Sequence, residues 1–380
     1  MAHYTATLDA PNGTPIGYIP NFLSLAVARS FNTVGSMTLV VHERHSPQTW
    51  AKDMQFKLFR GVPNGPSTLL GNTHWLVQKA RWLWSSHTWE ITATDAIGIL
   101  DNVIVAYHPD TLYADKTYDN GNQGYTDNLM RAYVRENLGT TAIAIDRRNP
   151  LITVEADLGL GIVAEKTAGW QELLSTLTGI ASDSEGLGTP LYFEMVPTSS
   201  GGFQFVVKTD YLGSDRSDKV VFSPSFNNLT EIELEWDFSN SANVVYVGGV
   251  GDGAGRLVSK VEDITGIERS PYGRLERFLD MREEDRTTVL QEEGLAFLTK
   301  AAPKAILNAK ALDTPSLMFG RDYFYGDKVK ATVGRFDFTP VISAFSVQYE
   351  NGNEDLDLRL KADTPLPTGT MLWEYGGWDN

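Results

Sequence analysis

The sequence predicts a mainly β protein with an α+β insertion, in which two similar antiparallel β-barrel domains flank the middle segment. Short segments near both ends alternate apolar and polar residues, with Gly, Pro and Asn clusters between them. The middle of the chain instead carries apolar residues at helical spacing. The 380 residues are enough for two or three domains. We place a first barrel at 1–104, the insertion at 105–225 and a second barrel with one long helix at 226–380.

The first range contains short strands at 36–41, 56–58 and 89–93. A period of two places one face of each strand in a core and the other in water. Turn residues at 12–15 and 62–66 separate these strands. We therefore expect a small antiparallel barrel or sandwich.

The insertion contains a predicted helix at 127–138, capped by Thr126 or Asp127. A second helix is predicted at 170–181, where Trp170 begins an apolar stripe. A hairpin follows, with strands at 191–196 and 203–207. The two stripes contain Met130, Tyr133, Val134 and Leu138 in the first helix, and Trp170, Leu173, Leu174, Leu177 and Ala181 in the second.

The last range returns to strands, at 231–238 and 243–247. A helix over 285–302 ends before Pro303, because the residue before a proline disfavours helical geometry. Its stripe contains Leu290, Phe297, Leu298 and Ala301. Residues 344–360 predict a hairpin around Asn351-Gly352, since Asn-Gly favours a two-residue β-turn.

The charge balance and the absence of cysteine exclude several classes of function. The chain has 32 basic and 48 acidic residues, a formal charge of −16, which argues against gripping a phosphate backbone. Without cysteine there is no disulfide, thiolate zinc site or thiol nucleophile. The N-terminus resembles no signal peptide, and no run of 18 apolar residues occurs. We expect a protein made in a cytosol, not exported by the Sec route, and without a membrane span.

Histidine offers a weak candidate for a metal site. All six histidines occur within the first 108 residues, and His42 and His45 are the tempting pair. Residues three apart on a strand point to opposite faces. We therefore expect structural or surface roles and predict no metal site.

The segment 249–254 formally matches the dinucleotide motif G-x-G-x-x-A. That motif requires a helix to open at once, whereas 257–261 is typical of a returning strand. We predict that the Gly248–Gly255 loop joins two strands and binds no nucleotide. No cofactor is predicted.

No catalytic residue is predicted. The sequence lacks G-x-S-x-G, and the acid pairs Glu283-Glu284 and Glu354-Asp355 are expected to be ordinary exposed charges. Trp82, Trp84 and Trp89 form an aromatic cluster. A barrel core or a subunit interface is favoured for them, and a sugar-stacking platform is the alternative.

A series of short motifs in the second half of the chain resembles one protein family. The motifs stand at 243–249, 256, 272–276, 280–282, 319–323 and 325–329, and 89–95 with 100–101 adds an N-terminal match. In this order the chain resembles tail proteins of long-tailed, non-contractile bacteriophages that carry the baseplate-hub fold.

The resemblance implies a homotrimer with two similar barrels per protomer, so that six barrels match a sixfold tail ring. It implies a structural role in the virion, at the tail tip, after assembly in the host cytoplasm. The implied partners are distal tail and tail tube ring proteins, tail fibre or tip proteins, the tape measure protein, and genomic DNA that passes through without specific binding. Some members continue into a C-terminal fibre or hydrolase region, whereas this sequence ends at Asn380; we therefore expect such activities on other proteins. The alternative is a carbohydrate-binding or cell-wall-degrading tip protein.

One predicted strand carries the candidate site. Its acidic face comprises Glu231, Glu233, Glu235 and Asp237, and its apolar face comprises Ile232, Leu234, Trp236 and Phe238. We expect the apolar face to pack inside a barrel. The acidic face is either an ordinary solvated surface or the wall of a channel past which DNA slides, since like charge repels DNA.

Overall fold

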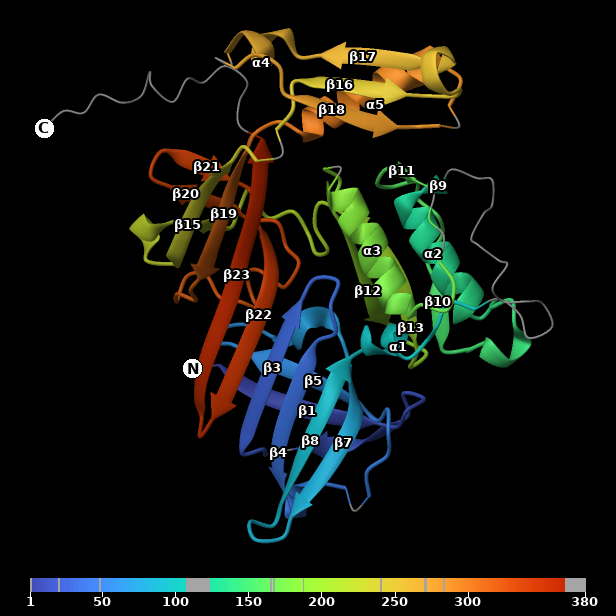
Figure 1. Ribbon diagram of the computed structural model, residues 1–380. Coiled ribbons are helices and arrows are strands. Elements are labelled where there is room, and N and C mark those ends of the chain that lie inside the picture. Colours follow the sequence, from blue (N-terminus) through green and yellow to red (C-terminus); the bar gives the residue numbers. More distant parts are fainter. Residues whose placement is uncertain are drawn as a thin grey trace, which may run out of the picture. The chain divides into compact units, whose positions relative to one another are not determined.

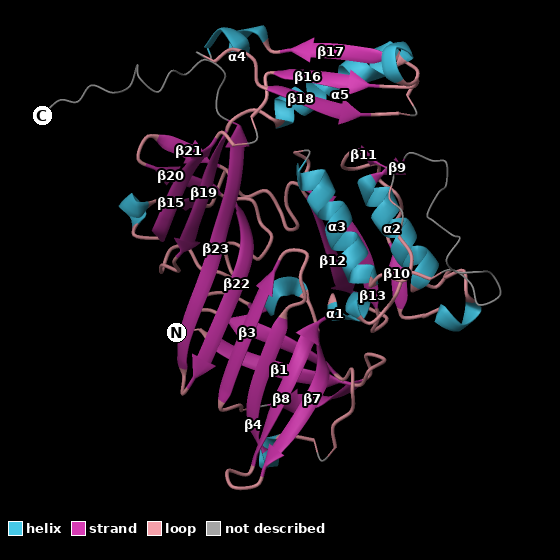
Figure 2. Cartoon of the chain, viewed as in Figure 1, coloured by secondary structure: helices cyan, strands magenta, loops and turns pink. Residues whose placement is uncertain are grey.

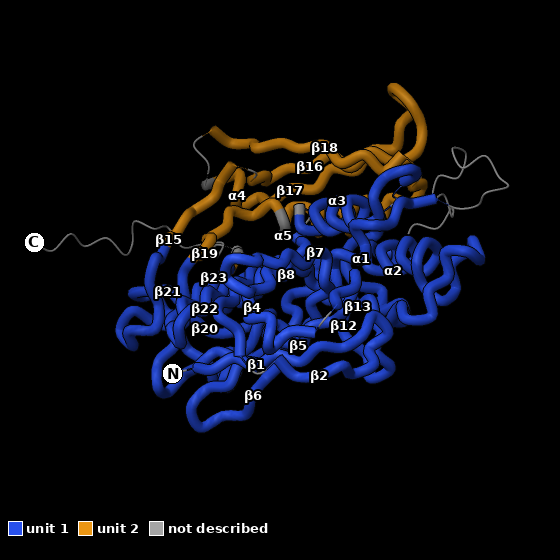
Figure 3. Tube along the Cα trace, turned by 90° about the horizontal axis from the view of Figure 1, so that it is seen from below, with its two compact units in different colours: residues 1–232, 309–361 blue, residues 233–308, 362–380 orange. Residues whose placement is uncertain are grey.

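The computed structural model describes most of the chain: residues 2–19, 21–47, 49–106, 124–164, 166, 168–186, 188–239, 241–269, 272–282 and 284–365. The chain divides into two compact units (Figure 3). The first contains residues 1–232 and 309–361, and the second is built on residues 233–308. The boundaries predicted at 104/105 and 225/226 stay a prediction.

One twelve-stranded sheet dominates the structure (Figure 1). Eleven strands follow one another in the order β15-β19-β23-β22-β3-β4-β8-β7-β5-β1-β2, and β6 pairs with β5. In chain order the strands are β1 (His3–Asp9), β2 (Pro15–Ile19), β3 (Ser24–Ser30), β4 (Ser36–His42), β5 (Gln55–Gly61), β6 (Ser67–Leu69), β7 (Trp75–Leu83), β8 (Thr88–Asp95), β15 (Leu229–Asp237), β19 (Lys304–Ala311), β22 (Val341–Glu350) and β23 (Asn353–Pro365).

This sheet does not confirm the predicted architecture of two barrels. Among the described strands the path from β15 to β2 does not close on itself, and no closed barrel is found. Strands from the two ends of the sequence instead join through antiparallel β3 and β22, from Ser24↔Glu350 to Ser30↔Ala344. The mainly β class is confirmed, and the pairing of two similar barrels is not.

The strands form where alternation predicted them. Strands β4, β5 and β8 cover the predicted segments 36–41, 56–58 and 89–93. The predicted C-terminal hairpin is β22–β23, and its turn residues Asn351 and Gly352 have φ of 52° and 81°. Two positive φ values are what the tight hairpin turn requires, so Asn-Gly determines this turn locally.

The insertion packs two long helices on a three-stranded sheet (Figure 2). In this sheet β13 (Phe203–Thr209) lies between antiparallel β12 (Leu191–Pro197) and parallel β10 (Ile152–Val154). The helices are α2 (Thr126–Asn137) and α3 (Leu173–Gly186), preceded by the short α1 (Gly98–Asp101). A two-stranded sheet pairs β9 (Gly124–Tyr125) with β11 (Val163–Ala164). A separate three-stranded sheet contains β14 (Val221–Phe222), β20 (Lys330–Val333) and β21 (Phe336–Phe338).

Two details of the helix predictions are wrong. Trp170 has φ of 61° and is 54% exposed, so it lies outside α3 rather than on its stripe. Neither Thr126 nor Asp127 caps α2, because their side chains serve the neighbouring loop. The Thr126 hydroxyl accepts from the amide of Ile162 at 3.1 Å, and the Asp127 carboxylate accepts from the amide of Leu160 at 2.7 Å.

The second unit is a three-stranded sheet with one helix against it. Strand β16 (Val244–Gly248) pairs antiparallel with β17 (Val258–Glu262) and parallel with β18 (Glu276–Asp280). Helix α5 (Thr287–Lys300) buries Leu290 and Leu298 against Val245 and Val247, as its predicted stripe requires. A short α4 (Ile264–Arg269) follows β17.

Candidate functional site: the exposed face of the main sheet

The acidic strand is β15, and its alternation is visible in its exposure. Glu231, Glu233 and Glu235 are exposed, while Asp237 is half-buried. Between them Ile232, Leu234 and Trp236 are half-buried rather than fully enclosed. Phe238 follows the end of the strand and is 53% exposed, so its predicted place in a core is wrong.

The four carboxylates differ in their surroundings. The Glu231 carboxylate accepts a hydrogen bond from Arg359 at 2.8 Å and lies 3.8 Å from the ammonium of Lys310. The backbone of Glu231 has a φ of 48°. Asp237 accepts from the hydroxyl and the amide of Ser239, at 2.6 and 2.8 Å, and these bonds lower its pKa. Within the described part of the chain, Glu233 and Glu235 form no ion pair. These two are therefore the carboxylates with the most freedom to act on a passing charge.

The sheet face that carries Asp357 and Arg359 of β23 is polar and made of small side chains. One row crosses five strands, because Asp357 pairs with Ser346, Ser346 with Ala28, Ala28 with Ser36, and Ser36 with Thr94. The next row contains Asp355, Gln348, Ala26, Thr38 and Thr92. All ten residues are exposed or half-buried, and we call them the polar sheet face.

The residues that alternate with this face form the core. The buried set on the other side contains Val27, Met37, Leu39, Ile91, Ala93, Phe345, Val347 and Leu358. Strand side chains alternate between faces, so the core fixes which residues the polar sheet face presents. A sequence signal existed here, namely the small residues at every second position of β3, but sequence reasoning missed it.

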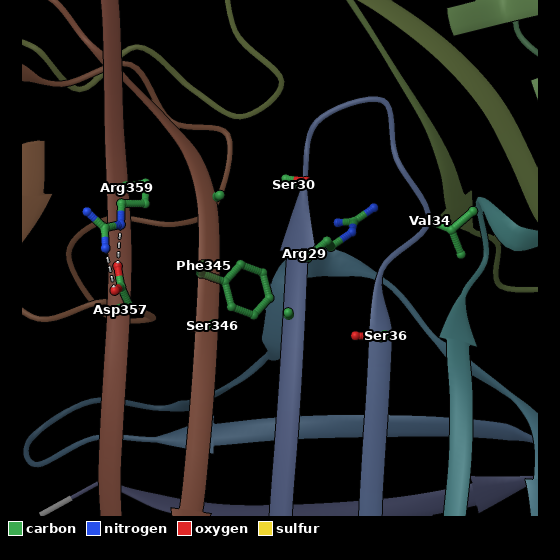
Figure 4. A pocket seen from close by; sticks show the side chains of 10 residues that line it. Arg29, Ser30, Val34, Ser36, Phe345, Ser346, Asp357 and Arg359 are labelled. Carbon is green, nitrogen blue, oxygen red and sulfur yellow. Dashed lines mark hydrogen bonds and ion pairs between the residues drawn. The ribbon is translucent and has the colours of Figure 1, made fainter. Parts of the chain in front are cut away.

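A shallow hollow of about 340 Å³ lies in the polar sheet face (Figure 4). It exists because Ala28, Ser36 and Ser346 are too small to fill the space between the strands. Asp357 and Arg359 of one strand border it and pair with each other at 2.8 Å (Figure 4). Its lining offers hydroxyl groups and a charge pair that is already satisfied.

A buried charge cluster supports this face from below. The Arg29 guanidinium lies 2.9 Å from Asp95 and 3.0 Å from Glu194, and 4.8 Å from the centre of the Tyr325 ring. Burial raises the pKa of Glu194, although Arg29 opposes this. Because Glu194 belongs to β12, the cluster joins the insertion to strands β3 and β8. Arg29 stands at an inward position of β3, a signal that sequence reasoning did not use.

The histidine pair is not brought together as a metal site. His42 accepts a bond from the amide of Arg44 through Nδ1 at 3.2 Å, which caps a single 3₁₀ turn at Glu43–His45. Among the described residues no group of three or more His, Asp or Glu is arranged to hold a metal. His108 and Glu283 lie outside the described residues.

The glycine-rich loop joins two antiparallel strands, as predicted. A short 3₁₀ turn at Gly253–Gly255 leads into β17, so strand β17 follows where a dinucleotide site would need a helix. Gly251 has φ of 98°, and a Cβ there would lie 2.6 Å from the Gly255 carbonyl oxygen. Glycine is therefore needed for the turn itself.

The tryptophan cluster is on the surface of the β7–β8 hairpin. Trp82 is 42% exposed and Trp84 is 69% exposed. The barrel-core interpretation is therefore wrong for these two residues. Trp89 is half-buried and pairs with Trp82 across the two strands.

The remaining sequence expectations concern membranes and acid pairs. None of the described helices is both long and apolar enough to span a membrane.

Of the acid pairs expected to be exposed, Glu354 is only 16% exposed at its side chain and pairs with Arg60. Glu284 is buried and pairs with Arg286 at 2.7 Å. Both carboxylates are held in ion pairs with arginine.

The structure is similar to solved phage tail proteins. Prophage tail protein gp18 from Listeria monocytogenes EGD-e superposes with a TM-score of 0.52 at 10% identity, over 94% of this chain and 94% of that one. The 43 kDa tail protein of prophage MuSo2 from Shewanella oneidensis gives a TM-score of 0.49 at 11% identity, over 94% of this chain and 98% of that one. The first likeness shows that the chain has the fold of a phage tail protein.

Sequence comparison gives the family. A search of curated proteins finds no match. The model of the Siphovirus ReqiPepy6 Gp37-like proteins matches residues 11–360, which is most of the chain. The resemblance noted in the sequence is thereby confirmed, and the chain belongs to the family of Siphovirus ReqiPepy6 Gp37-like proteins.

Proposed function

We propose that this protein is a structural component of a phage tail, acting as a trimeric hub at the distal end of the tail tube. The family and the fold of a phage tail protein support a tail component. The single observation that carries a tube-end role is the polar sheet face, a broad surface of small polar residues across five neighbouring strands. No catalytic role is proposed.

In this proposal the hub adapts a sixfold tail ring to a threefold tip. Its neighbours are the tail tube or distal tail ring, the tape measure protein, and tip or fibre proteins. A ring of copies is the common way for one chain to enclose a passage. The location is the virion, after assembly in the host cytoplasm.

The polar sheet face and the acidic strand β15 suit the wall of a DNA passage. A polymer with regular phosphates passes most easily along a wall that offers no clustered Lys or Arg. Here the exposed Glu233 and Glu235 repel phosphate. In the first unit the cations Lys310 and Arg359 are held by Glu231 and Asp357. We propose that Glu231, Glu233, Glu235 and Asp237 line the lumen of the trimer.

The mass of the assembly tests the trimer. Light scattering of the protein alone at high concentration is expected to give about three times 42.0 kDa. Imaging of the particle then locates the chain along the tail. A stable dimer in solution, or a single copy per particle, contradicts the proposal.

A carbohydrate-binding or cell-wall-degrading tip protein is the second candidate. The exposed Trp82 and Trp84 favour its binding half. A wall-lysis assay tests the degrading half, since a structural hub is expected to give no lysis, and a glycan pull-down tests the binding half.

A further inference from the structure

We propose that the tip of the β7–β8 hairpin is a binding site for a neutral hexopyranose of a glycan chain. The site consists of Trp82, Trp84 and Trp89 with the polar neighbours Glu43 and His87, and we call it the tryptophan corner. This site goes beyond the proposed hub function, because all of its residues belong to one protomer and sugar binding does not require the trimer.

The two exposed rings form a corner of fixed shape. The ring centres of Trp82 and Trp84 lie 5.0 Å apart, and their planes meet at 84°. One ring can therefore lie under the flat face of a sugar while the other contacts its edge. Aromatic residues left this exposed forgo a large apolar stabilisation, which binding would recover.

The corner is anchored to the core by a chain of aromatic contacts. Trp82 stacks on Trp89, with centres 6.3 Å apart and planes 25° apart. Trp89 lies 6.2 Å from Trp50, which in turn lies 5.9 Å from the fully buried Phe56. The exposed rings are therefore held before any ligand arrives, and a preorganised site loses less conformational entropy on binding.

Polar side chains flank one of the rings. His87 Nδ1 lies 3.0 Å from the Glu43 carboxylate, and the His87 ring lies 5.5 Å from that of Trp84. Both side chains are at least 36% exposed, so they offer polar groups beside Trp84 to the hydroxyl groups of a stacked sugar. The Arg81–Glu90 pair lies on the opposite face of the hairpin, because these residues alternate with Trp82 and Trp89.

This composition favours a sugar over a protein partner. The exposed apolar surface here is confined to two rings and is bordered by the polar pair of His87 and Glu43. Within the described hairpin, Trp82 and Trp84 are the large apolar side chains that are exposed, and Leu83 between them is half-buried. A hexopyranose combines an apolar C–H face with a rim of hydroxyl groups, which matches rings bordered by polar groups.

Titration of the full chain with cellohexaose, chitohexaose and maltohexaose tests the site, with heat and tryptophan fluorescence as readouts. At least one of them is expected to saturate with a dissociation constant on the order of 1 mM, typical of a small stacked contact. Trp84→Ala and Trp82→Ala are expected to weaken that binding about tenfold or more, equivalent to roughly 1.4 kcal/mol. Tyr272→Ala, at a side chain that is 91% exposed in the second unit, is the matched control and keeps wild-type affinity.

Conservative variants separate ring stacking from mere apolarity. Trp84→Phe retains a flat ring and is expected to retain part of the binding, whereas Trp84→Leu retains apolar area and is expected to lose it. If none of the three oligosaccharides binds the wild-type chain, the proposal is overturned. It is also overturned if Trp84→Leu binds sugar as well as wild type. If the Trp variants bind no differently but fail to enter particles, the corner is a protein contact instead.

Discussion

Arg60 and Glu354 form a two-point ion pair across 294 positions of the sequence. Nε and Nη2 of Arg60 lie 2.7 and 2.8 Å from the two carboxylate oxygens of Glu354. Arg60 is 2% exposed, and Nη2 also donates to Asp313 at 2.8 Å. The hydroxyl of Tyr4 donates to Glu354 as well. One guanidinium therefore connects β5, β23 and the loop that follows β19.

Replacing Arg60 by Met is expected to destabilise the first unit severely. The change leaves Glu354 and Asp313 without their shared cation in a largely buried setting. Removing one partner of a buried ion pair costs about 3–5 kcal/mol. Urea unfolding followed by fluorescence measures the loss.

Arg81→Ala is the control for this prediction, because the Arg81–Glu90 pair is exposed and such pairs contribute about 1 kcal/mol at most. A loss at Arg60→Met no larger than at Arg81→Ala contradicts the structural role of the network.

The buried Glu194 is expected to make the wild-type protein less stable as the pH rises. Burial raises the pKa of Glu194 above its ordinary 4.5, so the folded state holds its proton longer than the unfolded state does. Stability is then full below about pH 4.5 and falls as the pH rises through the higher folded pKa. Glu194→Gln removes this contribution. Urea unfolding at several pH values between 4 and 8 should give a difference between the two proteins that grows with pH.

Arg29→Met completes this test. It removes the cation that faces Asp95 and Glu194, and the expected loss is about 3–5 kcal/mol at neutral pH. A pH-independent difference between wild type and Glu194→Gln, together with a mild effect of Arg29→Met, would show that the cluster carries no buried charge.

His74 is expected to make the protein less stable as the pH falls below 6.5, which is opposite to the effect of Glu194. Burial is the main cause that lowers its pKa to about 4 from 6.5, and its Nδ1 lies 2.8 Å from the amide oxygen of Gln55. The unfolded state therefore binds a proton more readily between these two pKa values. Stability falls as the pH drops from 6.5 to 4, by roughly 3.4 kcal/mol at most. His74→Gln should flatten the dependence of the unfolding free energy on pH between 4 and 6.5. If the slope is unchanged in this variant, groups other than His74 cause the loss of stability in acid.

Local structure was predictable because its causes are local. The turn at Asn351-Gly352 and the stripe of Leu290 and Leu298 in α5 each depend on residues close in sequence. The pairing of β3 with β22 depends on segments more than 300 positions apart, and no local pattern encodes it. Two barrels were predicted because the two β-rich ends were treated separately, whereas their strands meet in one sheet.

The buried charges show the same limit. Glu354 has an acidic neighbour and looks like a surface residue in the sequence, and its role becomes visible only when β23 is aligned beside Arg60 of β5. Arg29 carried a signal in the sequence, since it follows Leu25 and Val27 at the inward positions of β3, but this signal was not used. The acidic strand was found by alternation, but its ion pairs with Lys310 and Arg359 come from distant strands.

The glycine-rich loop is expected to bind no nucleotide and to be sensitive to substitution at one position. Gly251→Val places a β-branched residue at φ of 98° and a Cβ 2.6 Å from a carbonyl oxygen, so a loss of about 1–3 kcal/mol is expected. Gly255→Ala is the matched control, since no atom lies within 4 Å of its added Cβ. Neither NAD nor ATP should change the melting temperature or release heat. A micromolar signal that disappears in Gly251→Val contradicts the prediction.

The lumen proposal makes its sharpest prediction at Glu233 and Glu235. Both side chains are exposed on β15, and side chains two apart on a strand are separated by about 6.6–7 Å. At physiological salt their repulsion extends only about 8 Å, so it acts on DNA solely in a narrow passage. Glu233→Lys/Glu235→Lys is expected to leave assembly intact and to slow DNA ejection, because two cations per protomer would then hold phosphates. Ejection triggered in vitro, followed by a DNA-binding dye at two salt concentrations, measures the rate, and higher salt should restore part of it.

Glu231 is left unchanged in that variant, because its ion pairs with Arg359 and Lys310 would confound stability with passage. Charge reversal at Asp252, an exposed acid of the glycine-rich loop, is the control and should not alter the rate. The lumen assignment fails if particles with Glu233→Lys/Glu235→Lys eject at the wild-type rate, or if their slow ejection is unaffected by salt. It also fails if imaging places these carboxylates on the outside of the ring, and the hub proposal would then stand on the trimer alone.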